Sequence, residues 1–190
     1  NSNDNFVLSE MSTRMKDIRG DIRDREQLFN VFNEEKPEIV FHLAAQALVI
    51  DGYSRPIDTY EINTIGTANV LEAVRQSNTV HTAVFITTDK VYENQEWFWP
   101  YRENEPMGGF DPYSSSKGAA ELIIASYRNS FFNPSKYSEH KKSIASARAG
   151  NVIGGGDWAP NRIVPDCILA IENSRTIEVR SPNAVRPWQH

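Results

Sequence analysis

Cysteine is almost absent from this chain, which has Cys167 alone among its 190 residues. A single cysteine excludes a framework of intrachain disulfides and fits a reducing compartment, so we expect a cytoplasmic protein. No apolar run approaches the roughly 20 residues that span a membrane, and the first residues do not have the pattern of a secretory signal. No spacing of His, Cys and carboxylate residues resembles a metal site, so we expect no bound metal.

Long basic runs are also absent. The 20 Lys and Arg residues are outnumbered by 25 Asp and Glu, for a net charge of −5, which argues against general affinity for nucleic acids. A hydrophobic content of 39% is enough for a core. The length of 190 residues fits one domain, or one domain with the start of another. There is no internal repeat and no low-complexity tract.

Short apolar runs alternate with segments of helical periodicity. The runs lie at residues 39–43, 81–87, 143–149 and 177–179, and runs that are apolar on both faces are typical of central strands in a parallel sheet. Helical spacing covers residues 25–35, 59–76, 113–131 and 162–172. This alternation predicts an α/β fold with a doubly wound parallel sheet of the Rossmann type. Residues 93–110 form a long connection, which is usually functional in a compact domain.

The sequence Asp111 to Lys117 (DPYSSSK) is the most informative motif. Pro112 suits the first turn of a helix, with Asp111 as its cap, and a spacing of four then places Tyr113 and Lys117 on one face. A nearby cation stabilises the phenolate of a tyrosine, whose pKa is otherwise about 10. Such a pair can remove a proton from a sugar hydroxyl while a hydride leaves the same carbon. A solvated helix face would also explain a bare Tyr-x-x-x-Lys.

The residues that follow each predicted strand are further candidates, because ligands of doubly wound folds bind at the carboxyl ends of strands. The first strand is followed by Leu43-Ala44-Ala45-Gln46, whose small residues allow a flat cofactor to approach, although tight packing explains them equally well. The second is followed by Thr88-Asp89-Lys90, and the third by a glycine-rich stretch from Gly150 to Gly156. Such a stretch could bind an anion or act as a flexible turn.

Together these motifs resemble the extended short-chain dehydrogenase/reductases that act on sugar nucleotides. The resemblance runs from about Gly20 to His190 and is carried most specifically by the segments 88–94, 101–109, 151–158 and 186–190. The dTDP-sugar 4,6-dehydratases of that family usually have Asp-Glu where this chain has Asp89-Lys90. The sequence therefore resembles the CDP-sugar branch more closely.

The resemblance implies roles for individual residues. The expected catalytic residues are Thr88, Asp89, Lys90, Tyr113 and Lys117, with Glu93 as an alternative base. The expected cofactor-binding residues are Asp21, Ile22, Leu43, Ala44, Ala45, Gln46 and Asn63, together with Tyr113 and Lys117. Asn151 and Arg186 are the expected substrate-binding residues, because an arginine fork matches phosphate oxygens.

The resemblance also implies NAD as cofactor and a nucleotide sugar as substrate, with CDP-glucose favoured. The implied reaction gives CDP-4-keto-6-deoxyglucose through oxidation at C4, loss of water across C5–C6 and hydride return to C6. A homodimer through residues 59–76 and 113–131 is expected, with no nucleic-acid or membrane partner. Two alternatives stay open, namely another epimerase, dehydratase or reductase of the same superfamily, and an inactive fragment that only binds nucleotide or a partner.

No strand followed by a glycine-rich turn precedes Asp21, although dinucleotide-binding folds hold the cofactor pyrophosphate on such a turn. We therefore expect residues 1–151 to form a partial NAD-binding Rossmann domain that lacks its first unit. Residues 152–190 are expected to begin an interleaved nucleotide-sugar-binding domain. We expect the 190 residues by themselves to bind NAD weakly.

Overall fold

The computed structural model describes residues 4–190, and their contacts divide them into two compact units. The main unit is Gly20–Ala149, and the terminal unit combines the described residues up to Arg19 with Gly150–His190. The expected division into domains at residues 1–151 and 152–190 stays a prediction. The assignment of residues 152–190 to nucleotide-sugar binding stays a prediction.

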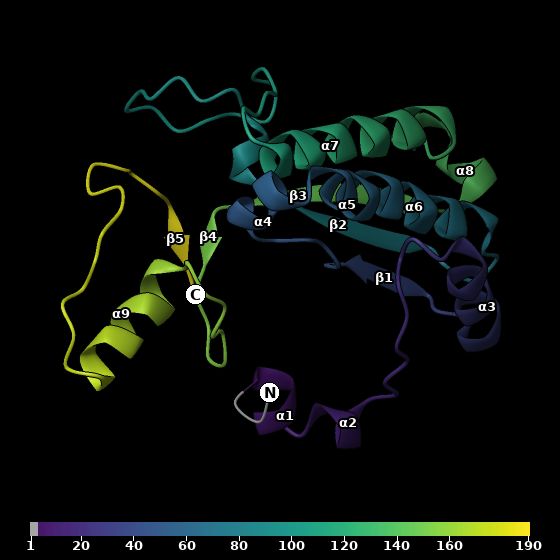
Figure 1. Ribbon diagram of the computed structural model, residues 1–190. Coiled ribbons are helices and arrows are strands. Elements are labelled where there is room, and N and C mark those ends of the chain that lie inside the picture. Colours follow the sequence, from purple (N-terminus) through teal and green to yellow (C-terminus); the bar gives the residue numbers. More distant parts are fainter. Residues whose placement is uncertain (1–3) are drawn as a thin grey trace. The chain divides into compact units, whose positions relative to one another are not determined.

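A parallel three-stranded sheet is the centre of the main unit (Figure 1). Its strands are β1 (Ile39–His42), β2 (Thr82–Thr88) and β3 (Ser143–Ala149), in the order β1-β2-β3. The register pairs His42 with Phe85 and Thr88 with Ala149, so the carboxyl ends of β2 and β3 meet at one edge. The parallel sheet with its crossover helices confirms the predicted Rossmann-type α/β class.

The apolar runs were expected to form central strands of the sheet, but of the three only β2 does so. Every residue of β2 is buried or half-buried, because it has a neighbouring strand on each side. On β1, Ile39 and Phe41 are exposed, and their fractional exposures are 52% and 64%. The prediction was wrong for β1 because an apolar sequence shows that a strand tolerates burial, not that anything covers it.

The predicted helix at residues 59–76 is a continuous helical segment with an irregular middle. It comprises α5 (Pro56–Tyr60), a π-helical turn η1 (Glu61–Ile65) and α6 (Gly66–Gln76). The short helix α4 (Val49–Ser54) precedes it, and α3 (Arg25–Glu35) packs against α6. Single π-helical turns occur often at functional sites, and this one contains the buried Asn63.

Helix α7 (Pro112–Ser130) confirms the predicted helix at residues 113–131. Asp111 caps it, since one carboxylate oxygen accepts from the Ser114 amide at 3.0 Å and the other from the Ser114 hydroxyl at 2.6 Å. Ile124 of α7 packs with α6 and β2 in a core made mainly of Val70, Leu71, Val74, Ala83 and Phe85. Figure 1 shows α4 to α7 covering the same face of the sheet. The turn η3 (Pro134–Lys136) and helix α8 (Tyr137–His140) lead from α7 to β3.

The long connection between β2 and α7 begins with the 3₁₀ turn η2 (Asp89–Val91) and is closed at its base. The Gly108 amide donates to the Val91 carbonyl at 2.8 Å, and the Glu93 amide donates to the Pro106 carbonyl at 3.0 Å. Tyr92 and Met107 form an antiparallel bridge between these bonds. We call residues 91–93 and 106–108 the neck of the loop.

The terminal unit contains α1 (Asn5–Leu8), α2 (Met11–Arg14), β4 (Asn151–Val152), α9 (Ile163–Glu172) and β5 (Trp188–Gln189). Strands β4 and β5 pair in parallel, and α9 confirms the predicted helix at residues 162–172. The predicted strand at residues 177–179 was wrong. Its Ile177 and Val179 side chains are exposed, and without a neighbouring strand such a short run gains no ladder of hydrogen bonds. Between residues 4 and 190, no helix is long and apolar enough to cross a membrane.

Candidate active site

Helix α7 places Tyr113 and Lys117 against the sheet. Both side chains are buried, at 9% and 5% exposure, so the face they share is not a solvated one. The Lys117 Nζ atom donates to the Ile86 carbonyl at 3.0 Å, two residues before Thr88 at the end of β2. This bond holds the Tyr-Lys motif at the carboxyl end of the middle strand, where doubly wound folds bind their ligands.

Burial governs the electrostatics around Lys117. Desolvation lowers the pKa of the Lys117 ammonium, and the negative charge of Glu121 opposes that shift. His42, at the end of β1, has its pKa lowered to about 4 by burial and by the charge of Lys117. The His42 imidazole is therefore neutral at pH 7 and shares a hydrogen bond of 3.1 Å with the Thr67 hydroxyl. Lys117 is consequently the cation that faces this part of the site.

Thr88, Asp89 and Lys90 form a cluster where β2 ends and η2 begins. The Thr88 hydroxyl donates to Asp89 Oδ1 at 3.1 Å, and Lys90 Nζ lies 3.3 Å from the same oxygen. The side chains of Asp89 and Lys90 are only about a quarter exposed, at 25% and 29%, so the pair is not a fully solvated surface ion pair. An acid and an amine are thus held side by side next to a buried hydroxyl.

Asn63 joins three segments of the main unit. Its Oδ1 accepts from the Gln46 amide at 2.8 Å, and its Nδ2 donates to the Gln46 carbonyl at 3.0 Å and to the Ser116 hydroxyl at 2.9 Å. Ser116 lies between Tyr113 and Lys117 on α7. Asn63 therefore ties the segment after β1 to the helix of the Tyr-Lys pair, and direct contact of Asn63 with a cofactor stays a prediction.

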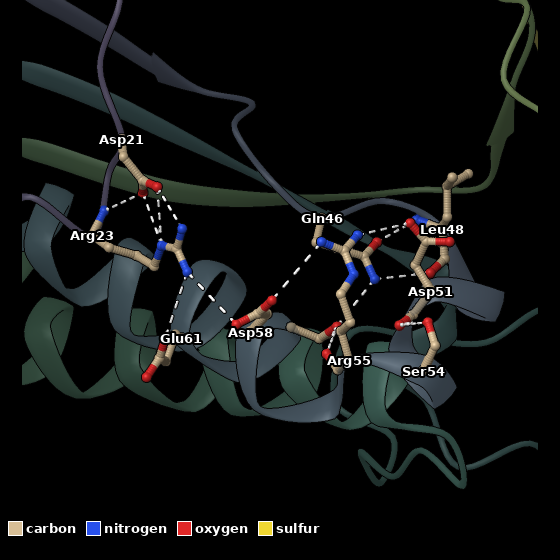
Figure 2. Close-up of polar contacts among 10 residues, drawn as sticks. Asp21, Arg23, Gln46, Leu48, Asp51, Ser54, Arg55, Asp58 and Glu61 are labelled. Carbon is tan, nitrogen blue, oxygen red and sulfur yellow. Dashed lines mark hydrogen bonds and ion pairs between the residues drawn. The ribbon is translucent and has the colours of Figure 1, made fainter.

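The segment after β1 leaves its small residues accessible. Leu43 and Ala44 are exposed, and Ala45 and Gln46 are half-buried. The Gln46 side chain holds the following turn, since its Oε1 accepts from the Leu48 amide at 2.5 Å and its Nε2 donates to the Leu48 carbonyl at 3.0 Å (Figure 2). An anchored backbone with short exposed side chains fits the prediction of a surface for a flat cofactor.

The Asp21 carboxylate forms an ion pair with Arg23. It accepts from the Arg23 guanidinium at 2.7 Å, and Arg23 also reaches Glu61 at 3.5 Å and Asp58 at 3.9 Å (Figure 2). The hydrogen bonds from Arg23 lower the pKa of the Asp21 carboxyl. Ile22, the next residue, packs so closely on α6 that a side chain at Gly66 would collide with it. The turn at residues 21–23 is therefore fixed against α5, η1 and α6.

The two expected substrate residues lie in the terminal unit. The Asn151 amide, on β4, donates to the Pro187 carbonyl at 2.9 Å. Arg186 is adjacent to Pro187, is exposed, and donates to the Val185 carbonyl at 3.0 Å. The structure brings these two residues near each other within that unit, and their contact with a substrate stays a prediction.

A buried polar network lies behind the site and was not predicted from the sequence. Glu121 Oε1 accepts from the Thr87 hydroxyl at 2.5 Å, and Oε2 accepts from Ser146 at 3.1 Å and from Arg148 at 3.0 Å. One signal was present in the sequence, because Glu121 follows Lys117 by four residues and so lies on the same face of α7. In the described part of the chain, no group of three or more His, Cys, Asp or Glu side chains is arranged to hold a metal.

The parallel sheet with its crossover helices places the chain in the class of Rossmann-type α/β folds. Residues 3–190 match the family described as GDP-mannose 4,6 dehydratase, and the chain belongs to that family.

Two individual proteins are similar to the chain along most of its length. The chain is 54% identical over 185 residues to CDP-glucose 4,6-dehydratase of Salmonella typhimurium, covering 97% of this chain and 52% of the relative. Among solved structures, it resembles a DesIV double mutant (dTDP-glucose 4,6-dehydratase) from Streptomyces venezuelae with NAD and DAU bound. The TM-score is 0.81 at 21% identity, covering 96% of this chain and 53% of that one, which supports the fold.

A second solved structure is more similar in sequence. It is UDP-glucose 4-epimerase of Thermus thermophilus in complex with NAD, with a TM-score of 0.65 at 32% identity, covering 75% of this chain and 43% of that one. The chain spans about half the length of the curated relatives it matches.

Proposed function

We propose that this chain forms part of an NAD-dependent nucleotide-sugar 4,6-dehydratase, a lyase that converts CDP-glucose to CDP-4-keto-6-deoxyglucose. The observation that carries the proposal is the buried Tyr113-Lys117 pair, with Lys117 bonded to β2 just before Thr88, Asp89 and Lys90. The identity of 54% to CDP-glucose 4,6-dehydratase of Salmonella typhimurium supports the choice of reaction and base.

The residues present fit NAD at the carboxyl edge of the sheet. Lys117 and Tyr113 offer a cation and a hydroxyl for the nicotinamide ribose, and the short exposed side chains after β1 leave room for a flat ring. The Asp21 carboxylate, although paired with Arg23, keeps lone pairs that can accept from an adenine amine. When bound, NAD would supply the acceptor for a hydride from C4 of the sugar and, once reduced, the donor of a hydride to C6.

Tyr113 and Thr88 act on the sugar O4 in the first step. Thr88 hydrogen-bonds this oxygen, and the Tyr113 phenolate removes its proton. Lys117 favours the phenolate because an opposite charge stabilises an anion, most strongly in a site shielded from water. The resulting ketone acidifies the proton on C5, which prepares the loss of water.

Asp89 and Lys90 act in the second step. Asp89 gives a proton to the departing 6-hydroxyl, and Lys90 handles the proton on C5, with Glu93 as an alternative base. The hydrogen bonds to Asp89 Oδ1 from Thr88 and Lys90 place the acid next to the group that binds O4. One short segment thus serves both the oxidation and the elimination.

Substrate binding, location and assembly complete the proposal. Asn151 and Arg186 of the terminal unit bind the diphosphate of the substrate, for which a guanidinium is well suited. The protein is a cytoplasmic homodimer whose contact uses residues 59–76 and 113–131. The single cysteine supports the location, and the exposed side chains of Ile65 on η1 and Leu122 on α7 support the contact.

The test is to incubate the full-length protein separately with CDP-, dTDP-, UDP- and GDP-glucose and to identify products by mass spectrometry. We expect a 4-keto-6-deoxy sugar, formed fastest from CDP-glucose. Epimerised or reduced sugars without loss of water would favour another enzyme of the superfamily. Nucleotide binding without turnover of any substrate would favour the inactive reading.

A further inference from the structure

Arg148, the penultimate residue of β3, connects three segments of the main unit. Its guanidinium donates to Glu121 Oε2 on α7 at 3.0 Å and to the Glu103 carbonyl of the long loop at 3.1 Å. It also lies 3.7 Å from the Met107 sulfur and 4.9 Å from the centre of the Tyr92 ring. Tyr92 and Met107 face each other across the neck, so Arg148 contacts both of its sides.

Glu121 holds the other end of this connection. Its side chain is only 5% exposed, yet it accepts hydrogen bonds from Thr87, Ser146 and Arg148. Burial raises the pKa of the Glu121 carboxyl, but these hydrogen bonds outweigh burial, so the net pKa is lowered. The buried partner of Arg148 is therefore a fully bonded carboxylate, which fixes the guanidinium in one orientation.

The neck connects directly to the residues expected to perform the elimination. Val91, which accepts from the Gly108 amide at 2.8 Å, immediately follows Lys90. Tyr113 and Lys117 have anchors outside the neck, since Asp111 caps their helix and Lys117 is bonded to β2. A loosened neck should therefore displace Asp89 and Lys90 more than the Tyr-Lys pair.

We propose that Arg148, held by Glu121, is a positioning residue that fixes Asp89 and Lys90 by clamping the neck to β3 and α7. This inference rests on the proposed function and deepens it, because it assigns the clamp to the elimination step rather than to the oxidation. A buried ion pair is often no more stabilising than apolar residues of the same volume, so core stability alone does not explain one here. The clamp also uses the guanidinium for three contacts that an apolar side chain cannot make.

The first measurement tests the clamp by hydrogen exchange and needs no activity assay. Arg148→Met should speed hydrogen exchange at the Glu93 and Gly108 amides by about tenfold or more, because local opening of the neck becomes easier. Since Arg148→Met leaves Glu121 buried without its cation, the double variant Glu121→Gln/Arg148→Met is measured too. It should show the same faster exchange at the neck, while the amides of β2 remain protected.

The second measurement follows the oxidation and the elimination separately in the full-length protein. Single turnovers of CDP-glucose are quenched, and the 4-keto-hexose and 4-keto-6-deoxyhexose are counted by mass spectrometry. The double variant should raise the ratio of the first to the second by about tenfold or more, since small misplacements of catalytic groups have effects of that size. A merely structural defect lowers the amount of active protein and leaves this ratio unchanged.

Arg75→Met is the matched control. Arg75 also pairs with a glutamate, Glu72, at 2.6 Å and lies 5.3 Å from the centre of an aromatic ring, that of Phe131, but it does not contact the neck. It should change neither the exchange at the neck nor the product ratio.

Two results separate the possible failures. Unchanged exchange at Glu93 and Gly108, or an equal loss of both steps, would overturn the clamp even if the wild type is an active dehydratase. A wild type that turns over none of the nucleotide sugars would overturn the proposed function, and with it the role of Arg148 in elimination. The exchange data would then still decide whether Arg148 holds the neck.

Discussion

Asn63 and Gln46 are joined by a pair of hydrogen bonds in which one side-chain amide satisfies both backbone groups of the other residue. The distances are 2.8 Å to the Gln46 amide and 3.0 Å to its carbonyl. Asn63 lies in the π-helical turn η1, and Gln46 lies in the segment after β1 that is expected to line the cofactor. The irregular turn thus coincides with the side chain that links the helix to the strand end.

Replacing Asn63 by alanine should destabilise the protein by about 2–4 kcal/mol. The variant loses one buried and two half-buried hydrogen bonds, each worth about 0.5–1.5 kcal/mol, and leaves backbone groups of Gln46 unsatisfied. Denaturant unfolding measures the change. Asn133→Ala, which removes an exposed cap of η3, is the control and should cost clearly less. Equal costs would show that the Asn63 bonds contribute little.

Removal of the phenol tests the proposed base. In the full-length protein, Tyr113→Phe should lower turnover of CDP-glucose by about 10²-fold or more, because a positioned acid–base group contributes 10²–10⁴-fold. Steady-state kinetics should show little change in substrate affinity. The exposed Tyr137 provides the control, since Tyr137→Phe should retain wild-type turnover. Near-normal turnover of Tyr113→Phe would remove this tyrosine from the mechanism.

Asp89→Asn should separate oxidation from elimination. The amide cannot supply a proton to the 6-hydroxyl, so the 4-keto-hexose and reduced nicotinamide should accumulate in a single turnover. Rapid mixing with absorbance detection of the reduced nicotinamide, followed by product analysis, measures both. Asp51 lies on α4 and pairs with Arg55, and Asp51→Asn, which disturbs that ion pair, should behave as the wild type. If oxidation and elimination slow equally, Asp89 is not a dedicated acid.

The free energy of unfolding should decrease as the pH is lowered from about 6.5 to 4.5, because of His42. Its folded-state pKa of about 4 lies below the value of 6.5 for an unperturbed histidine, so the unfolded state binds the proton first. Stability is therefore full above about pH 6.5 and decreases by about 2–3 kcal/mol on going down to pH 4.5. Glu72 also has a lowered pKa, about 2, but it starts from 4.5 and contributes only below that pH.

Unfolding free energies at several pH values, compared between the wild type and His42→Gln, measure this term. The variant should have a flatter curve over the same range. Ile144→Val is the control, because Ile144 lies in the same core on β3, with β2 between it and the strand of His42, and does not titrate. It should lower the whole curve without changing its slope. Parallel curves for His42→Gln and the wild type would contradict the assignment.

The sequence predicted much of the main unit. Helical periodicity located its helices around residues 25–35, 59–76 and 113–131, and also the helix at residues 162–172 of the terminal unit, while apolar runs located the three strands of the parallel sheet. These signals are local, because the spacing of apolar residues along a helix or strand reflects one buried face. The spacing of Tyr113 and Lys117 likewise placed them on one face of α7, which the structure buries.

The predictions that were wrong concerned features that depend on contacts between distant segments. The run at residues 177–179 has the composition of a strand but pairs with none in the described part of the chain, and Phe41 of β1 is exposed on an uncovered face. Composition indicates which secondary structure and burial a segment tolerates, whereas contacts with neighbouring segments decide which of them it adopts.

The sequence by itself determined the helices, the parallel strands and the Tyr-Lys pair, because each follows from the spacing of residues within one segment. Only the tertiary structure decided the bonds of Asn63 to Gln46 and Ser116, and the network of Glu121 with Arg148 and Thr87. These partners lie between 17 and 53 residues apart in the chain. Their meeting depends on which strands are adjacent and in what register, and no local pattern of residues encodes that.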